Sequence, residues 1–161
     1  MALTLTKDAP NFPFSVVAKD SEGNLGAALP VGAAGVKVTA NPEGVAVVSL
    51  DPNPVPVNNP FDPYTGTKSV SSGVVNPMEV GNSTITAAIL NPDGTSLAEI
   101  TDTVSVVDPA PGVAPWAGTL FGAGAPIALP APGTAAKAAA PTPIHHNASS
   151  THSHEEEKKR K

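Results

Sequence analysis

Side chains that could supply an imidazole or a thiol are confined to the C-terminal end of this 161-residue chain. The sequence has no cysteine, and its four histidines are His145, His146, His152 and His154. Neutral imidazole is a good ligand for Zn²⁺ or Ni²⁺, so these histidines could chelate such an ion loosely. The rest of the chain has no Ser–His–Asp or Cys–His arrangement, no histidine metal site and no disulfide. We predict no resident metal and no cofactor.

Carboxylates are the remaining candidates for catalysis, because a pair of them can act as general acid and general base. The acidic residues of the first 108 positions stand mostly in turn-like contexts: Asp20, Glu22, Glu43, Asp51, Asp62 and Asp93. Turns favour aspartate because its side chain hydrogen-bonds to nearby backbone groups. This context favours a structural role, and we predict that the chain is not an enzyme.

One proline-rich stretch concentrates oxygen ligands. Residues 51–64 hold five prolines together with Asp51, Asn53, Asn58, Asn59, Asp62 and Tyr64. Ca²⁺ prefers such hard oxygen ligands, but the spacing matches no known calcium loop, and Asx turns beside prolines are the alternative interpretation. An aromatic ring beside polar groups also suits a sugar. A ligand-binding set of Asn58, Asn59, Asp62 and Tyr64 is therefore one hypothesis.

Short strands must position these side chains. The chain has 14 glycines and 19 prolines, and both residue types disfavour helix interiors. Runs rich in Val, Ile and Thr, each bounded by turn residues, occur at 3–6, 14–19, 36–40, 45–50, 67–75, 83–90 and 96–107. The pattern predicts an all-β sandwich or barrel of seven or eight short strands.

The clearest local signal is a hairpin around Asn91-Pro-Asp-Gly94. Asp-Gly supplies the positive φ that such turns need, and apolar alternation flanks the turn on both sides. The alternation along the predicted strands also gives a set of candidate core positions: Val16, Val38, Val47, Ile85, Ile89, Ile100 and Val106.

Composition divides the chain into three parts. Residues 1–108 form the predicted sandwich, residues 109–143 are an Ala/Pro/Gly-rich linker, and residues 144–161 are a His-rich, charged tail that we expect to be disordered. The linker contains one apolar segment, residues 113–121, with Trp116, Leu120 and Phe121. These three side chains either fold back over a sheet edge or bind another protein as an anchor, because tryptophan is enriched in interface hot spots.

Charge and hydropathy exclude two classes of partner. Residues 1–108 carry four lysines and eleven acids, so this part has a net charge of −7, although the whole chain is at −5. An acidic body argues against nucleic-acid binding, which depends on phosphate neutralisation. No apolar run approaches the roughly 20 residues that span a bilayer, and the N-terminus has no signal-peptide pattern. We expect neither a nucleic-acid nor a membrane partner.

Several strand motifs follow one another in a familiar order: Val36-Lys-Val-Thr-Ala-Asn41, Val45-Ala-Val-Val-Ser49, Gly81-Asn-Ser-Thr-Ile-Thr-Ala87, Asp93-Gly94 and Asp102-Thr-Val-Ser-Val-Val107. This order resembles the bacterial immunoglobulin-like (group 2, invasin/intimin-type) domain over about half of the chain. The resemblance implies an immunoglobulin-like β-sandwich used for adhesion, spacing or display, without catalysis. The proline-rich insertion at 52–63 departs from the family's pattern.

Such domains also occur on structural proteins of tailed phages, and a chain without an export signal suits that setting. The resemblance therefore implies an accessory structural protein of a phage virion, displayed on the head or tail, with the major capsid or tail protein as its partner. The alternative is an adhesion module that binds a carbohydrate or another feature of the host surface.

Overall fold

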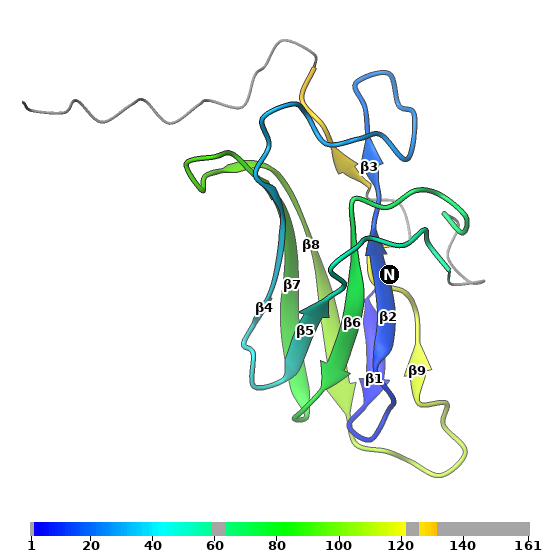
Figure 1. Cartoon of the computed structure of the whole chain (residues 1–161). Helices are drawn as coiled ribbons and strands as arrows, with labels where there is room; N and C mark the ends of the chain where they lie inside the picture. Colours follow the sequence, from blue (N-terminus) through cyan, green and yellow to red (C-terminus); the bar gives the residue numbers. More distant parts are fainter. Residues whose placement is uncertain (1, 59–63, 122–125, 132–161) are drawn as a thin grey trace, which may run out of the picture.

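The computed structural model describes residues 2–58, 64–121 and 126–131. These residues form ten strands and no helix (Figure 1). The strands are β1 (Leu3–Thr6), β2 (Phe12–Val16), β3 (Ala18–Lys19), β4 (Gly35–Asn41), β5 (Ala46–Leu50), β6 (Ser71–Pro77), β7 (Gly81–Leu90), β8 (Ser96–Val107), β9 (Trp116–Ala117) and β10 (Ile127–Ala128).

The strands form two facing sheets. The larger sheet has the order β4-β7-β8-β1-β9, and the smaller one has the order β2-β6-β5 (Figure 1). Neighbouring strands run antiparallel, except for the parallel pair of β1 and β8. A short parallel pair of β3 and β10 continues the sandwich beyond the end of β2. The chain is therefore an all-β sandwich, which confirms the predicted fold class.

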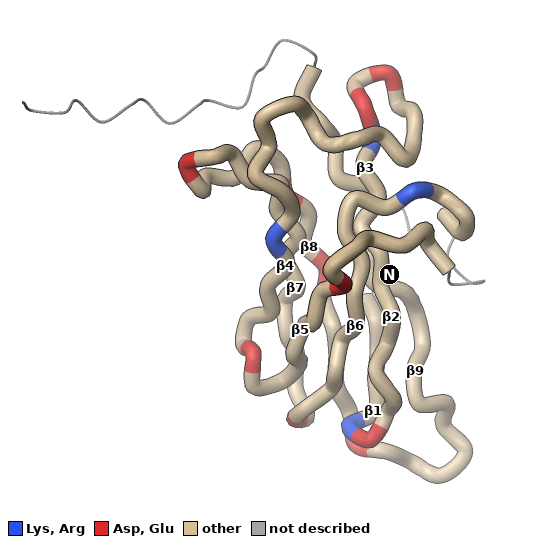
Figure 2. Tube along the Cα trace, viewed as in Figure 1, with Lys and Arg blue, Asp and Glu red and all other residues tan. Residues whose placement is uncertain are grey.

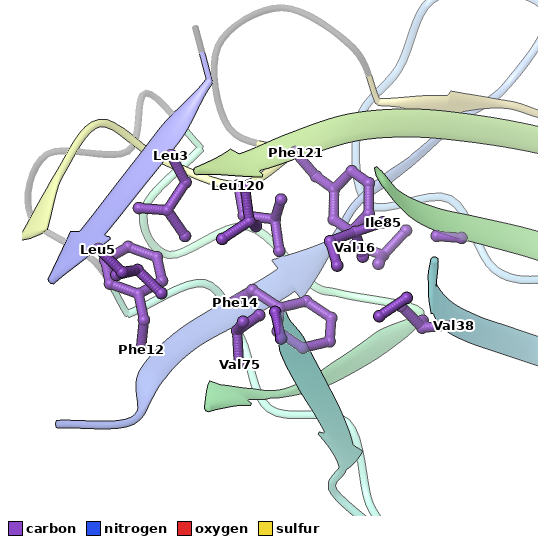
Figure 3. Close-up of a cluster of buried hydrophobic side chains, with 14 of the residues drawn as sticks. Leu3, Leu5, Phe12, Phe14, Val16, Val38, Val75, Ile85, Leu120 and Phe121 are labelled. Carbon is purple, nitrogen blue, oxygen red and sulfur yellow. The ribbon is translucent and has the colours of Figure 1, made fainter. Parts of the chain in front are cut away.

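Alternating apolar residues on the inner faces of both sheets build one core. The larger sheet contributes Leu3, Leu5, Val38 and Ile85, and β2 contributes Phe12, Phe14 and Val16 from the opposite side (Figure 3). Side chains at every second position of a strand point to the same face, so this spacing places them together between the sheets. The core predictions at Val16, Val38, Ile85, Ile89 and Val106 are confirmed, since all five side chains are buried.

Val47 was expected in the core, and that prediction is wrong. Its side chain is 38% exposed, whereas Ala46 is fully buried and Val48 packs against the core. The run from Val45 to Leu50 is apolar at both odd and even positions, so its pattern does not distinguish the inward face from the outward one. Ile100 is an intermediate case, because it is partly buried against the core.

The predicted hairpin joins β7 to β8. Each residue of β7 from Gly81 to Leu90 pairs with β8, and one register irregularity lies at Ile89/Leu90 beside the turn. Within the turn, the amide of Gly94 donates to the carbonyl of Asn91 at 2.9 Å, and Gly94 has a φ of 83°. The Asp93 carboxylate accepts hydrogen bonds from the Thr95 amide and hydroxyl. Local sequence therefore accounts for this turn.

The predicted linker, residues 109–143, contains two short strands within its described part. We call residues 116–121 and 126–131 the C-terminal strap. In the strap, β9 pairs antiparallel with β1, β10 pairs parallel with β3, and Leu120, Phe121 and Ile127 are buried. A high content of Ala, Pro and Gly is typical of a linker. A few apolar residues within such a segment are nevertheless enough to cover an open sheet edge. The predicted disordered tail at 144–161 lies outside the described residues.

Candidate functional site

Aromatic side chains close one side of the sandwich, where β1 and β9 of the larger sheet face β2, an edge strand of the smaller one. Trp116 stands opposite Leu5 in the β1–β9 register, and its ring lies edge-on to Phe12 with centroids 5.5 Å apart. Phe121 makes a second edge-on contact with Phe14 at 6.0 Å. Such T-shaped pairs add stabilisation beyond the area that they bury. Both contacts join β2 to the strap, so the strap seals this side.

A partly buried carboxylate of β8 fixes the strap's backbone. Asp102 stands opposite the buried Ile85 in the β7–β8 register, so it occupies an inward position of β8. Its Oδ2 accepts a hydrogen bond from the backbone amide of Phe121 at 3.0 Å. Phe121 has a φ of 56°, a left-handed conformation that is uncommon for a bulky residue. Sequence reasoning missed Asp102, although an acid at an inward position of an alternating strand is a usable signal.

These contacts place the predicted partner-binding set, Trp116, Leu120 and Phe121, against its own chain. Leu120 and Phe121 are 2% and 4% exposed, so both side chains pack inside their own chain (Figure 3). Trp116 is partly buried and keeps some exposed surface. Of the two interpretations of this segment, folding back over a sheet edge describes the structure, because the inward side chains of β1 and β2 need a cover on this side.

A cavity of about 180 Å³ lies between the proline-rich loop and the smaller sheet. The loop contributes residues 51 and 55–58, the smaller sheet contributes residues 12–15 and 73–74, and the strap contributes Leu120. The lining is mainly apolar, and Asp51, Asn58 and Ser15 are its polar members. A concave site with an apolar lining and a few polar groups is typical of small-ligand binding.

Serine side chains tether the loop to β6 and the residues before it. The Ser72 hydroxyl donates to the Asp51 carboxylate at 2.6 Å and accepts from the Val55 amide at 3.0 Å. The Ser69 hydroxyl also donates to the Val55 carbonyl. Further along, Val57 and Thr67 are joined by a backbone hydrogen bond of 3.0 Å. The loop is thus held on β6 by side chains as well as by its backbone.

The predicted ligand-binding set is only partly brought together. Asn58 lines the cavity, Tyr64 is partly buried outside that lining, and Asn59 and Asp62 lie outside the described residues. Of the calcium candidates, Asp51 also lines the cavity, and Asn53 is exposed. Within the described ranges, no three His, Cys, Asp or Glu side chains gather where they could hold a metal ion. The four histidines lie outside those ranges.

Acidic residues occur at turns and loop tips in many places (Figure 2). In the turn after β3, the Asp20 carboxylate accepts from the Asn24 side-chain amide at 2.9 Å and from the Asn24 backbone amide at 2.8 Å. These two hydrogen bonds, in that order, lower the pKa of Asp20 below its ordinary value. Asp51, Asp93 and Asp102 likewise accept hydrogen bonds that shape loops, turns or the strap.

No protein-family model matches the chain, and no curated protein matches it in sequence. Among solved structures, the chain is similar to domains 4 and 5 of the S-layer protein SbsC, with 24% sequence identity and a TM-score of 0.42. The similarity covers 66% of this chain and 47% of that one, so the chain spans about half the length of the S-layer structure. The described residues contain no helix that is long and apolar enough to cross a membrane.

Proposed function

We propose that the chain is a non-catalytic accessory structural protein of a phage virion, displayed on the head or tail through its sandwich. The main support for a non-catalytic role is that several carboxylates of the chain hold its backbone in place. Asp20, Asp51, Asp93 and Asp102 all accept hydrogen bonds from amides or hydroxyls that hold the backbone in place. Catalytic carboxylates need a reacting group within hydrogen-bond reach, whereas these four are committed to the fold.

The sequence resemblance to group 2 bacterial immunoglobulin-like domains supports the same proposal. The residues that carry it fall on β4, β7, the hairpin turn and β8 of the larger sheet and on β5 of the smaller one. A sandwich of this kind can act as a spacer or a displayed module, although the fold alone does not determine function. In a lattice of many copies, each contact with the major capsid or tail protein can be weak, because avidity multiplies it.

The proposal predicts that the chain is present in purified particles at many copies each. Mass spectrometry of particles from lysates of the organism that encodes the chain, with isotope-labelled peptides for quantification, measures that number. A copy number that scales with the major capsid or tail protein supports a decoration role. Particles that lack the chain, from a lysate that contains it, would overturn the proposal.

The cavity under the proline-rich loop favours a second candidate function, an adhesion module that binds a carbohydrate of the host surface. Asp51, Asn58 and Ser15 are the polar members of its mainly apolar lining. A glycan array with the whole chain tests this function. Asn58→Ala should abolish a true signal, and Asn53→Ala, an exposed asparagine of the same loop outside the cavity, should leave it unchanged. An array without signal above background would exclude the candidate.

A further inference from the structure

The C-terminal strap is held to the sandwich by few backbone contacts. Two residues of β9 pair with β1, and two residues of β10 pair with β3. The Phe121 amide adds its hydrogen bond to Asp102, and the Leu129 amide donates to the Lys19 carbonyl at 2.8 Å. Most of the remaining attachment comes from buried apolar side chains, chiefly those of Leu120, Phe121 and Ile127.

The strap occupies a defined apolar opening in the side of the sandwich. We call this opening the strap slot; it is lined by Leu5 of β1 and by Phe12 and Phe14 of β2. Without the strap, these three side chains would lose the cover that keeps each of them at most 5% exposed. Every copy of the chain therefore carries both a slot and a segment that is complementary to that slot.

The loop that leads to the strap is longer than its own connection requires. Val106 and Trp116 both pair with Leu5, from opposite sides of β1, so the chain crosses two strand spacings, or about 10 Å. The eight residues between β8 and β9, 108–115, are all exposed and could span about 27 Å when extended. The loop therefore gives the strap enough reach to enter the slot of an adjacent copy.

We propose that the strap is exchangeable, so that the strap of one chain fills the strap slot of a second copy. The exchanged contact uses the residues that the closed chain already uses, which is the basis of strand exchange between identical protomers. Because the strap is tethered to its own sandwich, its effective concentration at its own slot is on the order of 1 mM. Exchange between copies therefore needs a protein concentration of comparable size. The inference stands whether or not the chain occurs on a particle.

A disulfide trap tests the exchange directly, because the natural chain has no cysteine. Thr4 and Ala117 are Cα partners across β1 and β9, so Thr4→Cys combined with Ala117→Cys places two thiols within bonding range. The double variant is unfolded and then refolded at a protein concentration of about 1 mM or about 1 μM. Each sample is oxidised after refolding. We expect covalent dimers on non-reducing gels after refolding at the higher concentration and intramolecular disulfides after refolding at the lower one.

The matched control places the thiols in the β7–β8 hairpin, where the two strands are joined by a short turn. Thr84 and Thr103 are also Cα partners with exposed side chains, so Thr84→Cys combined with Thr103→Cys should give only intramolecular disulfides at both concentrations. Light scattering of the natural chain after the same refolding should show a dimer at the higher concentration alone. Intramolecular disulfides in the strap variant at both concentrations would overturn the proposal, as would equal dimer yields from strap and hairpin variants.

Discussion

The β7–β8 hairpin and the C-terminal strap fill the same core, but they are held in opposite ways. In the hairpin, all of β7 pairs with β8 across a turn of a few residues. The strap pairs through two strands of two residues each, and its partner strand β1 is distant in sequence: Thr6 and Pro115, which share a hydrogen bond, are 109 positions apart. Burial alone therefore does not show how firmly a segment is held.

The largest expected difference between the two regions concerns a pair of isoleucines. Ile85 in β7 and Ile127 in β10 are both fully buried, so the same truncation removes the same buried atoms. Ile85→Ala should lower the free energy of unfolding by about 2–5 kcal/mol, because a cavity remains in the centre of the core. Ile127→Ala should cost at most about 2 kcal/mol, because the strap can detach while the sheets stay folded.

Urea denaturation of the two isoleucine variants measures both losses, since the midpoint shifts at constant slope when only stability changes. Hydrogen exchange provides a second readout: Ile127→Ala should speed exchange at strap amides and leave β7 amides protected. Equal losses of stability, with exchange rising across the whole chain, would show that strap and hairpin unfold as one unit.

A smaller difference is expected from two aspartates that hold backbone amides. Asp102→Ala removes the acceptor of the Phe121 amide at a partly buried position, where leaving the amide without a partner should cost at most about 1–3 kcal/mol. Asp93→Ala removes the acceptor of the Thr95 amide in the exposed hairpin turn, where water can replace it. Exchange at Phe121 should rise in the first variant and stay unchanged in the second. Unchanged protection at Phe121 after Asp102→Ala would remove Asp102 from its positioning role.

The same contrast explains which parts of the fold could be predicted from sequence. Local sequence predicts the hairpin, through the turn residues Asp93-Gly94 and the alternation of apolar and polar residues from Ser83 to Leu90. The strap contains no comparable pattern, since its buried apolar residues stand among Ala, Pro and Gly. Its ring contacts, Trp116 with Phe12 and Phe121 with Phe14, join residues more than a hundred positions apart. Only the tertiary structure brings these residues together, and composition therefore suggested a linker.

The candidate site was predictable to a similar, limited degree. Oxygen-bearing side chains in the proline-rich stretch pointed to the correct loop, and Asn58 and Asp51 do line its cavity. The rest of the lining comes from β2, β6 and Leu120 of the strap, which no local pattern connects to that loop. For Asp102, the alternation of β8 could have marked an acid at an inward position, but its partner, a backbone amide 19 positions away, follows only from the tertiary structure.

A glycine substitution in the hairpin turn tests, with a smaller expected effect, whether the turn residues themselves set the strand register. Gly94 has a φ of 83° in otherwise open space, so Gly94→Ala forces a left-handed alanine and should cost about 1–2 kcal/mol. Gly44, between β4 and β5, also lies in open space but without a positive φ, so Gly44→Ala should be close to neutral. Thermal unfolding of both variants compares them. A neutral Gly94→Ala would show that the turn adapts and that strand pairing, rather than turn chemistry, sets the register.

The smallest expected effect is a pH dependence of the stability of the contact between β10 of the strap and β3. Asp20 closes the turn that follows β3, and β3 is the strand with which β10 pairs. The lowered pKa of Asp20 means that the folded chain favours the carboxylate more than the unfolded chain does. Its stabilising contribution is therefore complete above the ordinary value of 3.8, and it is lost as the pH falls through the lower folded value.

The Leu129 amide reports on this attachment, because it donates to the carbonyl of Lys19, the residue just before Asp20. Its NMR chemical shift should change with the titration of Asp20 below pH 3.8. Asp20→Asn should abolish the transition at Leu129. A transition that persists in this variant would mean that another group controls the attachment, and the turn after β3 would then have no part in holding the strap.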